Sequence, residues 1–80
     1  MDTDLNHYST MLHARAERLR GQAEIVRQES DLLRDLNTPA YLSSCSGRDR
    51  ILKQVQVLEQ AVRGLVVFRD ELVACMETNF

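Results

Sequence analysis

The chain has 80 residues, of which 44% are hydrophobic and 28% are charged, and its net charge at pH 7 is −2. This composition indicates one small folded domain and excludes a disordered segment. Residues 39–80 carry five acidic and five basic side chains, and residues 1–38 are more acidic than basic, so neither half is typical of a nucleic-acid-binding surface. The polar, acidic start argues against a signal peptide, and no apolar run approaches the roughly 20 residues of a membrane span. We therefore expect a cytoplasmic protein without membrane insertion.

The first predicted helix covers about residues 4–36. Its middle repeats every seven residues, as AERLR at 16–20, AEIVR at 23–27 and SDLLR at 30–34. A seven-residue period is typical of a helix that keeps one seam against another helix. We predict that this seam contains large aliphatic residues alternating with small ones, which would allow a near approach of the second helix. The predicted seam residues are Leu12, Ala16, Leu19, Ala23, Val26 and Leu33.

The opposite face of this helix is charged. Acidic and basic side chains three residues apart, such as Glu24 and Arg27, are spaced to pair on a solvated helix surface. The basic column could also bind an acidic partner, but acids beside it at every turn favour the solvated face.

Residues 37–47 are predicted to form the hinge. Asn37 is suited to a left-handed conformation at the end of a helix, and Pro39 disfavours helical geometry at Thr38. Thr38 and Pro39 also suit the start of a short helical turn that would include Tyr41.

The second predicted helix covers about residues 48–77, with a capping pattern that begins at Ser46. Its side of the seam is predicted to include Ile51, Val55 and Leu58. Two helices of this length joined by a short hinge predict an all-α, two-helix antiparallel hairpin, resembling a coiled coil.

The second half of this helix has more apolar residues than one neighbouring helix covers. Residues 65–68 (LVVF) and 73–76 (VACM) point in several directions around the helix. Uncovered apolar surface usually marks an interface, so we predict completion by a protein partner or by dimerisation. The alternative cover is a third layer made by Tyr41, Leu42 or Phe80. The predicted partner-binding residues are Val62, Leu65, Val66, Val67, Phe68, Leu72, Val73 and Met76.

No catalytic or metal-binding pattern stands out. His7 and His13 are six residues apart and do not share a helix face, and Cys45 and Cys75 are a helix length apart. Cys75 is predicted to be a small buried residue, whereas Cys45 lies in the hinge as a candidate exposed thiol. We expect no enzymatic activity, cofactor, metal or small-molecule substrate.

Residues 58–72 (LEQAVRGLVVFRDEL) resemble the C-terminal helix of the small E-type co-chaperones of bacterial type III secretion needles, the YscE-like family. The resemblance implies a short helical hairpin that pairs with a larger helical chaperone and keeps the needle subunit from polymerising. It also implies that the contacts lie on the second helix, at Val62, Leu65, Val66, Phe68 and Leu72.

The chain is also similar to the needle subunit of the same secretion system. The turn at residues 38–42 (TPAYL) and the sequence FRDEL at 68–72 carry this second resemblance. The co-chaperone or adaptor ranks first among the functions, and a self-assembling helical hairpin, polymeric or dimeric, is the alternative.

Overall fold

The computed structural model describes the backbone of residues 2–79 and the side chains of residues 5–77. It contains three helices, α1 (Asp2–Leu36), α2 (Pro39–Leu42) and α3 (Cys45–Asn79). No strand occurs in the described residues, so the all-α class predicted from the sequence is confirmed. Phe80 lies outside the described residues.

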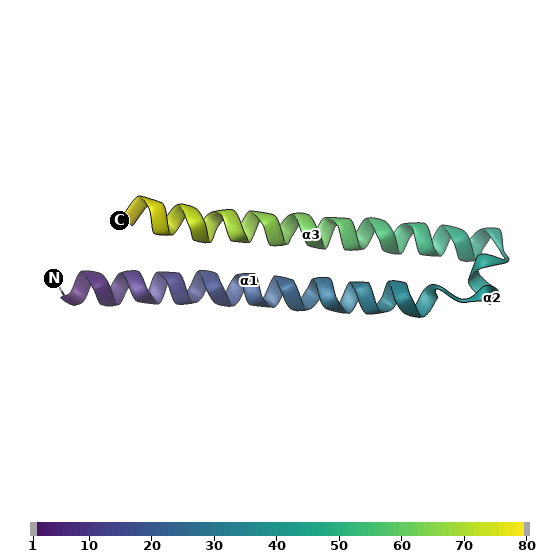
Figure 1. The fold of residues 1–80 in the computed structure, drawn as a ribbon, viewed down its shortest axis with the longest axis horizontal. Helices are drawn as coiled ribbons and strands as arrows, with labels where there is room; N and C mark the ends of the chain where they lie inside the picture. Colours follow the sequence, from purple (N-terminus) through teal and green to yellow (C-terminus); the bar gives the residue numbers. More distant parts are fainter. Residues whose placement is uncertain (1, 80) are drawn as a thin grey trace.

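The two long helices lie side by side, and both ends of the chain are at the same end of the molecule (Figure 1). The chain reverses at α2, and the molecule measures 64 × 16 × 11 Å. The residues of α1 and α3 that lie next to each other keep a single register along the whole pair. Tyr8 lies near Cys75, Gln22 bonds to Ala61, and Glu29 bonds to Gln54.

Two non-helical residues, Asn37 and Thr38, separate α1 from α2. The Thr38 amide donates to the Leu36 carbonyl over 2.8 Å, and Thr38 itself is extended, with φ −125° and ψ 156°. Pro39, which favours an extended residue before it, then opens α2. The predicted left-handed conformation at Asn37 is wrong, because no described non-glycine residue has a positive φ.

Helix α3 begins at Cys45, three residues earlier than predicted. The Ser44 hydroxyl accepts a hydrogen bond from the Gly47 amide over 3.0 Å. Ser44 therefore caps the helix in the place that the sequence suggested for Ser46, since a serine before the first turn satisfies a free amide of that turn.

The seam lies on one side of each helix, with neighbours three and four residues apart. On α1 it contains the predicted Leu12, Leu19, Val26 and Leu33, all partly buried. The second column on α1 is formed by Tyr8, Arg15, Gln22, Glu29 and Leu36. On α3 the seam contains Ile51, Gln54, Leu58, Ala61, Leu65, Phe68, Leu72 and Cys75.

The prediction that Ala16 and Ala23 lie in the seam is wrong, because both are exposed. The reason is that α1 is rotated so that longer side chains reach α3. The Gln22 amide donates to the Ala61 carbonyl over 2.9 Å, and the Gln54 amide donates to the Glu29 carboxylate over 2.6 Å. Buried or half-buried polar pairs of this kind fix the register of two helices at some cost in apolar contact.

The outer face of α1 is charged, as predicted. Arg27 bonds to Asp31 over 3.0 Å and also pairs with Glu24. The hydrogen bond from Arg27 holds the pKa of Glu24 below its usual value. These groups are exposed, so each pair contributes little to stability.

Gly47 is needed where α2 meets α3. A Cβ atom there would lie 2.6 Å from the Tyr41 Cα and 2.7 Å from the Ser44 Oγ. Backbone atoms cannot move aside cheaply, so α2 and the first turn of α3 would have to separate. Gly21, in contrast, has nothing within 4 Å of its Cβ position.

These two glycines give a matched test of the fold. Gly47→Ala is expected to lower the free energy of unfolding by about 2 kcal/mol or more, in the range of strained core substitutions. Gly21→Ala is expected to raise it by about 0.5–1 kcal/mol, because alanine favours the helix. Urea unfolding followed by circular dichroism measures both. Equal effects of the two changes would contradict the placement of α2 against α3.

Candidate protein-interaction surface

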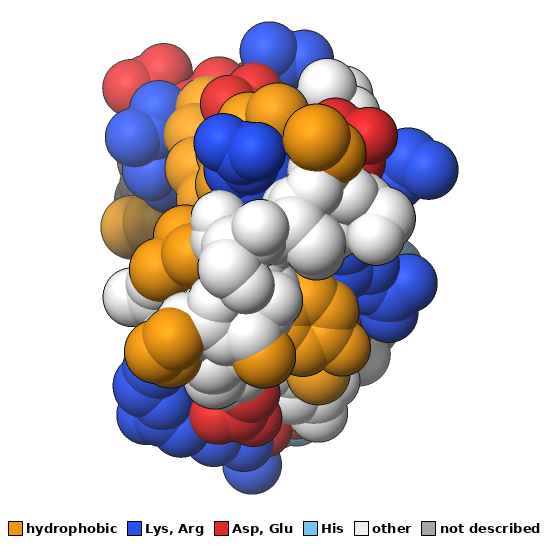
Figure 2. Space-filling view, turned by 90° about the vertical axis from the view of Figure 1, so that its right-hand side faces the viewer, with side chains coloured by type: hydrophobic (Ala, Val, Ile, Leu, Met, Phe, Trp, Pro, Cys, Tyr) orange, Lys and Arg blue, Asp and Glu red, His pale blue; other side chains and the backbone are white. Residues whose placement is uncertain are grey.

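The helix pair leaves much of its apolar surface uncovered. Among the described residues, the hydrophobic ones that are buried are Ala61 and Cys75, each 7% exposed. The buried Cys75 agrees with the prediction. Seen from the α2 end, hydrophobic side chains reach the surface among arginine and lysine side chains (Figure 2). Two helices are too few to enclose a core, so many large hydrophobic side chains stay exposed.

The eight predicted partner-binding residues divide into two groups. Leu65, Phe68 and Leu72 are partly buried and belong to the seam. The other five are exposed, namely Val62 at 41%, Val66 at 39%, Val67 at 53%, Val73 at 44% and Met76 at 47%.

Four of the five exposed residues share one side of α3. Val62, Val66, Val73 and Met76 are four, seven and three residues apart, which keeps them on one helix face. Val67 follows Val66 by one residue and therefore points about 100° away from it. The structure thus does not bring Val67 together with the other four.

The shared face extends further than the sequence analysis predicted. Continuing the three-and-four spacing adds Arg69 between Val66 and Val73, and it adds Glu59 and Leu52 before Val62. Val55, predicted as a seam residue, is partly buried at the edge of this face. We call the whole set the valine stripe, and it consists of Leu52, Val55, Glu59, Val62, Val66, Arg69, Val73 and Met76.

The valine stripe is hollowed at two places. One depression is lined by Val55, Leu58, Glu59, Val62 and Arg63. The other is lined by Leu19 of α1 together with Leu65, Val66 and Arg69 of α3. The second depression shows that the stripe runs along the edge of the seam, so a third helix laid on it would also touch α1.

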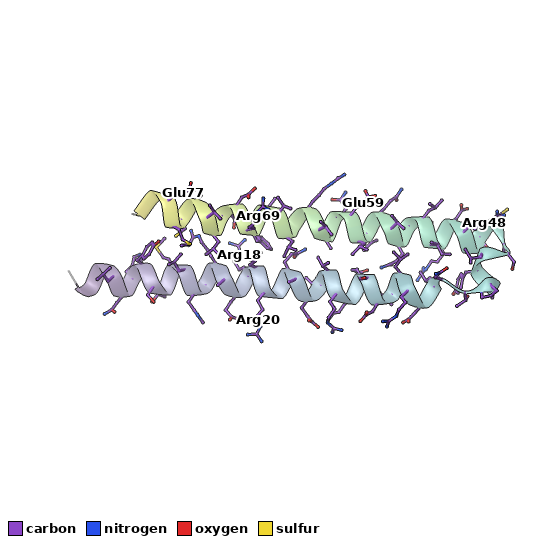
Figure 3. All side chains as sticks on the ribbon, viewed as in Figure 1. Arg18, Arg20, Arg48, Glu59, Arg69 and Glu77 are labelled. Atoms are coloured by element: carbon purple, nitrogen blue, oxygen red, sulfur yellow. The ribbon has the colours of Figure 1, made fainter. Side chains whose placement is uncertain are left out.

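The opposite edge of the seam is closed by a charged side chain. Arg18 reaches from α1 toward α3, whereas Arg20 points away from it (Figure 3). The Arg18 guanidinium lies 3.5 Å from the Glu71 carboxylate and 4.7 Å from the centre of the Phe68 ring. Nearer to α2 the same edge also carries exposed apolar side chains, Ile25 at 44% and Leu32 at 49% on α1 and Val57 at 46% on α3.

The small residues of α1 border the valine stripe. On α1, Ala16 and Ala23 lie on one side of Leu19 and Arg18 on the other. Because Arg18 marks the edge opposite the stripe, Ala16 and Ala23 lie on the stripe's edge. Their small side chains leave the stripe accessible from the α1 side.

The alternative cover from the hinge is not formed. Tyr41 and Leu42 are 40% and 49% exposed, and α2 packs on the start of α3 (Figure 1). Neither residue reaches the Val66 region, because the first turns of α3 and this region are about 30 Å apart along the helix.

Other kinds of site have no support in the described residues. They contain no group of three or more His, Cys, Asp or Glu side chains that could hold a metal ion. Within the same part of the chain, neither long helix has a stretch apolar enough to span a membrane. Cys45 is exposed and Cys75 is buried, and neither forms a disulfide bond.

Comparisons with known proteins gave no match. No family model matches the chain, and neither does any curated protein or solved structure.

The division between seam and stripe predicts different effects on stability. Phe68→Ala is expected to lower the free energy of unfolding by about 2 kcal/mol, because Phe68 packs in the seam under Arg18. Val66→Ala is expected to change it by less than about 0.5 kcal/mol, as is usual for exposed positions. Urea unfolding at high dilution, where association is weakest, measures both. If Val66→Ala lowered the free energy of unfolding by more than about 0.5 kcal/mol, Val66 would be packed within the helix pair, which would contradict its place on the stripe.

Proposed function

We propose that this chain is a non-catalytic protein–protein interaction module, an antiparallel helical hairpin whose valine stripe is covered by a helix from another protein chain. The observation that carries the proposal is the continuous spacing of the stripe. Eight residues follow one another at intervals of three and four on a single face of α3, and six of them are apolar. This is the pattern of a helix-binding seam.

The size of the stripe fits a helix better than a small ligand. From Leu52 to Met76 it covers 25 positions, which is about 36 Å of helix. Five of its apolar residues, Leu52, Val62, Val66, Val73 and Met76, are 39% to 61% exposed. An apolar strip of this length is typical of interfaces and uncommon on monomeric proteins.

The resemblance of residues 58–72 to the E-type co-chaperones gives the proposal its most specific form. In this form the chain is a cytoplasmic co-chaperone or adaptor that stabilises a larger helical chaperone or holds a secretion subunit. Val62 and Val66, two contact positions implied by the resemblance, belong to the valine stripe. The alternative is a self-assembling structural hairpin, which the same stripe would also serve.

A photo-crosslinking amino acid tests the proposal without knowledge of the partner. Placed at position 66 in cells that express the chain, it is expected to give a defined cross-linked product, because this position faces the covering helix. Placed at position 67, it is expected to give little or none of the same product, since Val67 points away from the stripe. Gel electrophoresis and mass spectrometry measure the yield and identify the product.

The yields at positions 66 and 67 decide whether the chain is an interaction module. Equal yields at positions 66 and 67, or no product at 66, would contradict it. A position 66 product that contains either a different protein or a second copy of this chain would support it, and its mass separates these two possibilities.

A further inference from the structure

The valine stripe has a symmetry that identifies what covers it. Its eight residues form four pairs, and the midpoint of every pair falls at Gly64. The inner pair is Val62 with Val66, and the next is Glu59 with Arg69. The outer pairs are Val55 with Val73 and Leu52 with Met76. Read from either end, the stripe therefore presents apolar residues opposite apolar residues and an acid opposite a base.

This inference rests on the proposed function and names the partner of the same surface. We propose that the valine stripe is covered by the valine stripe of a second copy of this chain, running antiparallel about a two-fold axis level with Gly64. Antiparallel helices in this contact bring each residue opposite the one that shares its midpoint. A two-fold contact uses the same patch on both copies, so the patch has to be complementary to itself.

Charge complementarity selects this arrangement over the parallel one. In the antiparallel pair, Glu59 of each copy lies opposite Arg69 of the other, which gives two ion pairs at symmetric positions. In a parallel pair in register, Glu59 would lie beside Glu59 and Arg69 beside Arg69, and both contacts would be repulsive. Within one chain the ion pairs of these groups are exposed, with Arg63 4.0 Å from Glu59 and Asp70 2.9 Å from Arg69, so each group is accessible to a second copy.

Helix α1 supplies a second, independent match to the same axis. Its small-residue column, on the stripe's side of the molecule, has Ser9 paired with Ser30 and Ala16 with Ala23, and both midpoints fall between Leu19 and Arg20. Leu19 lies beside Leu65, and Gln22 bonds to Ala61. The midpoint of the α1 column therefore lies at the same height along the molecule as Gly64 of α3, so one two-fold axis relates both columns.

Stacking two copies about this axis gives a four-helix bundle. The two α3 helices pack through their valine stripes, and the two α1 helices approach through serine and alanine, whose size permits a small interaxial distance. Arg20 and Arg27 alternate with these small residues at the same three-and-four spacing, so they lie within the α1 contact, where each is paired with a glutamate of its own helix. The bundle thus covers the apolar residues of the valine stripe that the single helix pair leaves exposed.

Charge reversal tests the orientation directly. The wild-type chain of 9.2 kDa is expected to sediment as a dimer of twice that mass. Glu59→Arg alone places two arginine pairs in the contact, and Arg69→Glu alone places two glutamate pairs there. Each is expected to raise the dimer dissociation constant by about tenfold or more, since two attractive pairs become repulsive.

Mixing the two variants supplies the second half of the test. A Glu59→Arg chain and an Arg69→Glu chain have opposite charges at both contacts, so they are expected to form a heterodimer with near wild-type affinity. Lys53→Glu and Asp49→Arg, which lie on a side of α3 away from the stripe, are matched controls and are expected to leave the dimer unchanged. Circular dichroism of each variant checks that the helices are retained, and analytical ultracentrifugation measures association.

Several results would overturn the second-copy proposal. These are a monomeric wild-type chain, an open polymer, or a dimer that neither charge reversal weakens. Failure of the mixed variants to associate would overturn it as well. If the chain is monomeric while a cross-linker at position 66 captures a different protein, the interaction module stands and the two-fold dimer falls. If position 66 captures nothing, both fall.

Discussion

The whole structure depends on the fact that two helices share only one seam. Each long helix buries a single side against the other, so any apolar residue on another side stays in water unless a further helix covers it. A chain of this size also obtains little stability from its own core. In this molecule the seam includes polar residues such as Gln22, Glu29 and Gln54, which reduces the apolar contact within the pair. Because the pair has only one seam, it buries little apolar surface by itself. The apolar residues left outside the seam are therefore suited to contact a further helix.

Much of this arrangement was predictable from the sequence, because heptad spacing reports directly on helix faces. Local patterns predicted the two long helices, the break at Thr38 and Pro39, and most aliphatic seam residues. They did not predict the rotation of α1 about its own axis. Ala16 and Ala23 repeat with the seam leucines, and nothing in their spacing tells which side of Leu19 faces α3. That choice is made by contacts across the pair, such as Arg18 with Glu71 and Gln22 with Ala61.

The prediction of the interaction surface was incomplete for a related reason. The sequence shows that residues 65–68 exceed what one neighbour covers, but a run of adjacent residues points around the helix and does not define a face. In the structure Val66 and Val67 separate onto different sides, while Leu65 and Phe68 enter the seam. Glu59 and Arg69 were missed because only apolar residues of the second helix were taken as interface candidates. The three-and-four spacing that passes through both of them was the available signal.

The position of these two charges determines how specific the surface is. A stripe of valines alone would accept a helix in either direction and in several registers, since apolar contact is not directional. A single acid and a single base, placed evenly about Gly64, favour one direction and one register, because every other alignment leaves a charge against apolar side chains or against a like charge. Exposed ion pairs add little affinity, so their contribution here is to exclude alternatives. In the proposed dimer the apolar residues would then supply the affinity, and the charges would select the alignment.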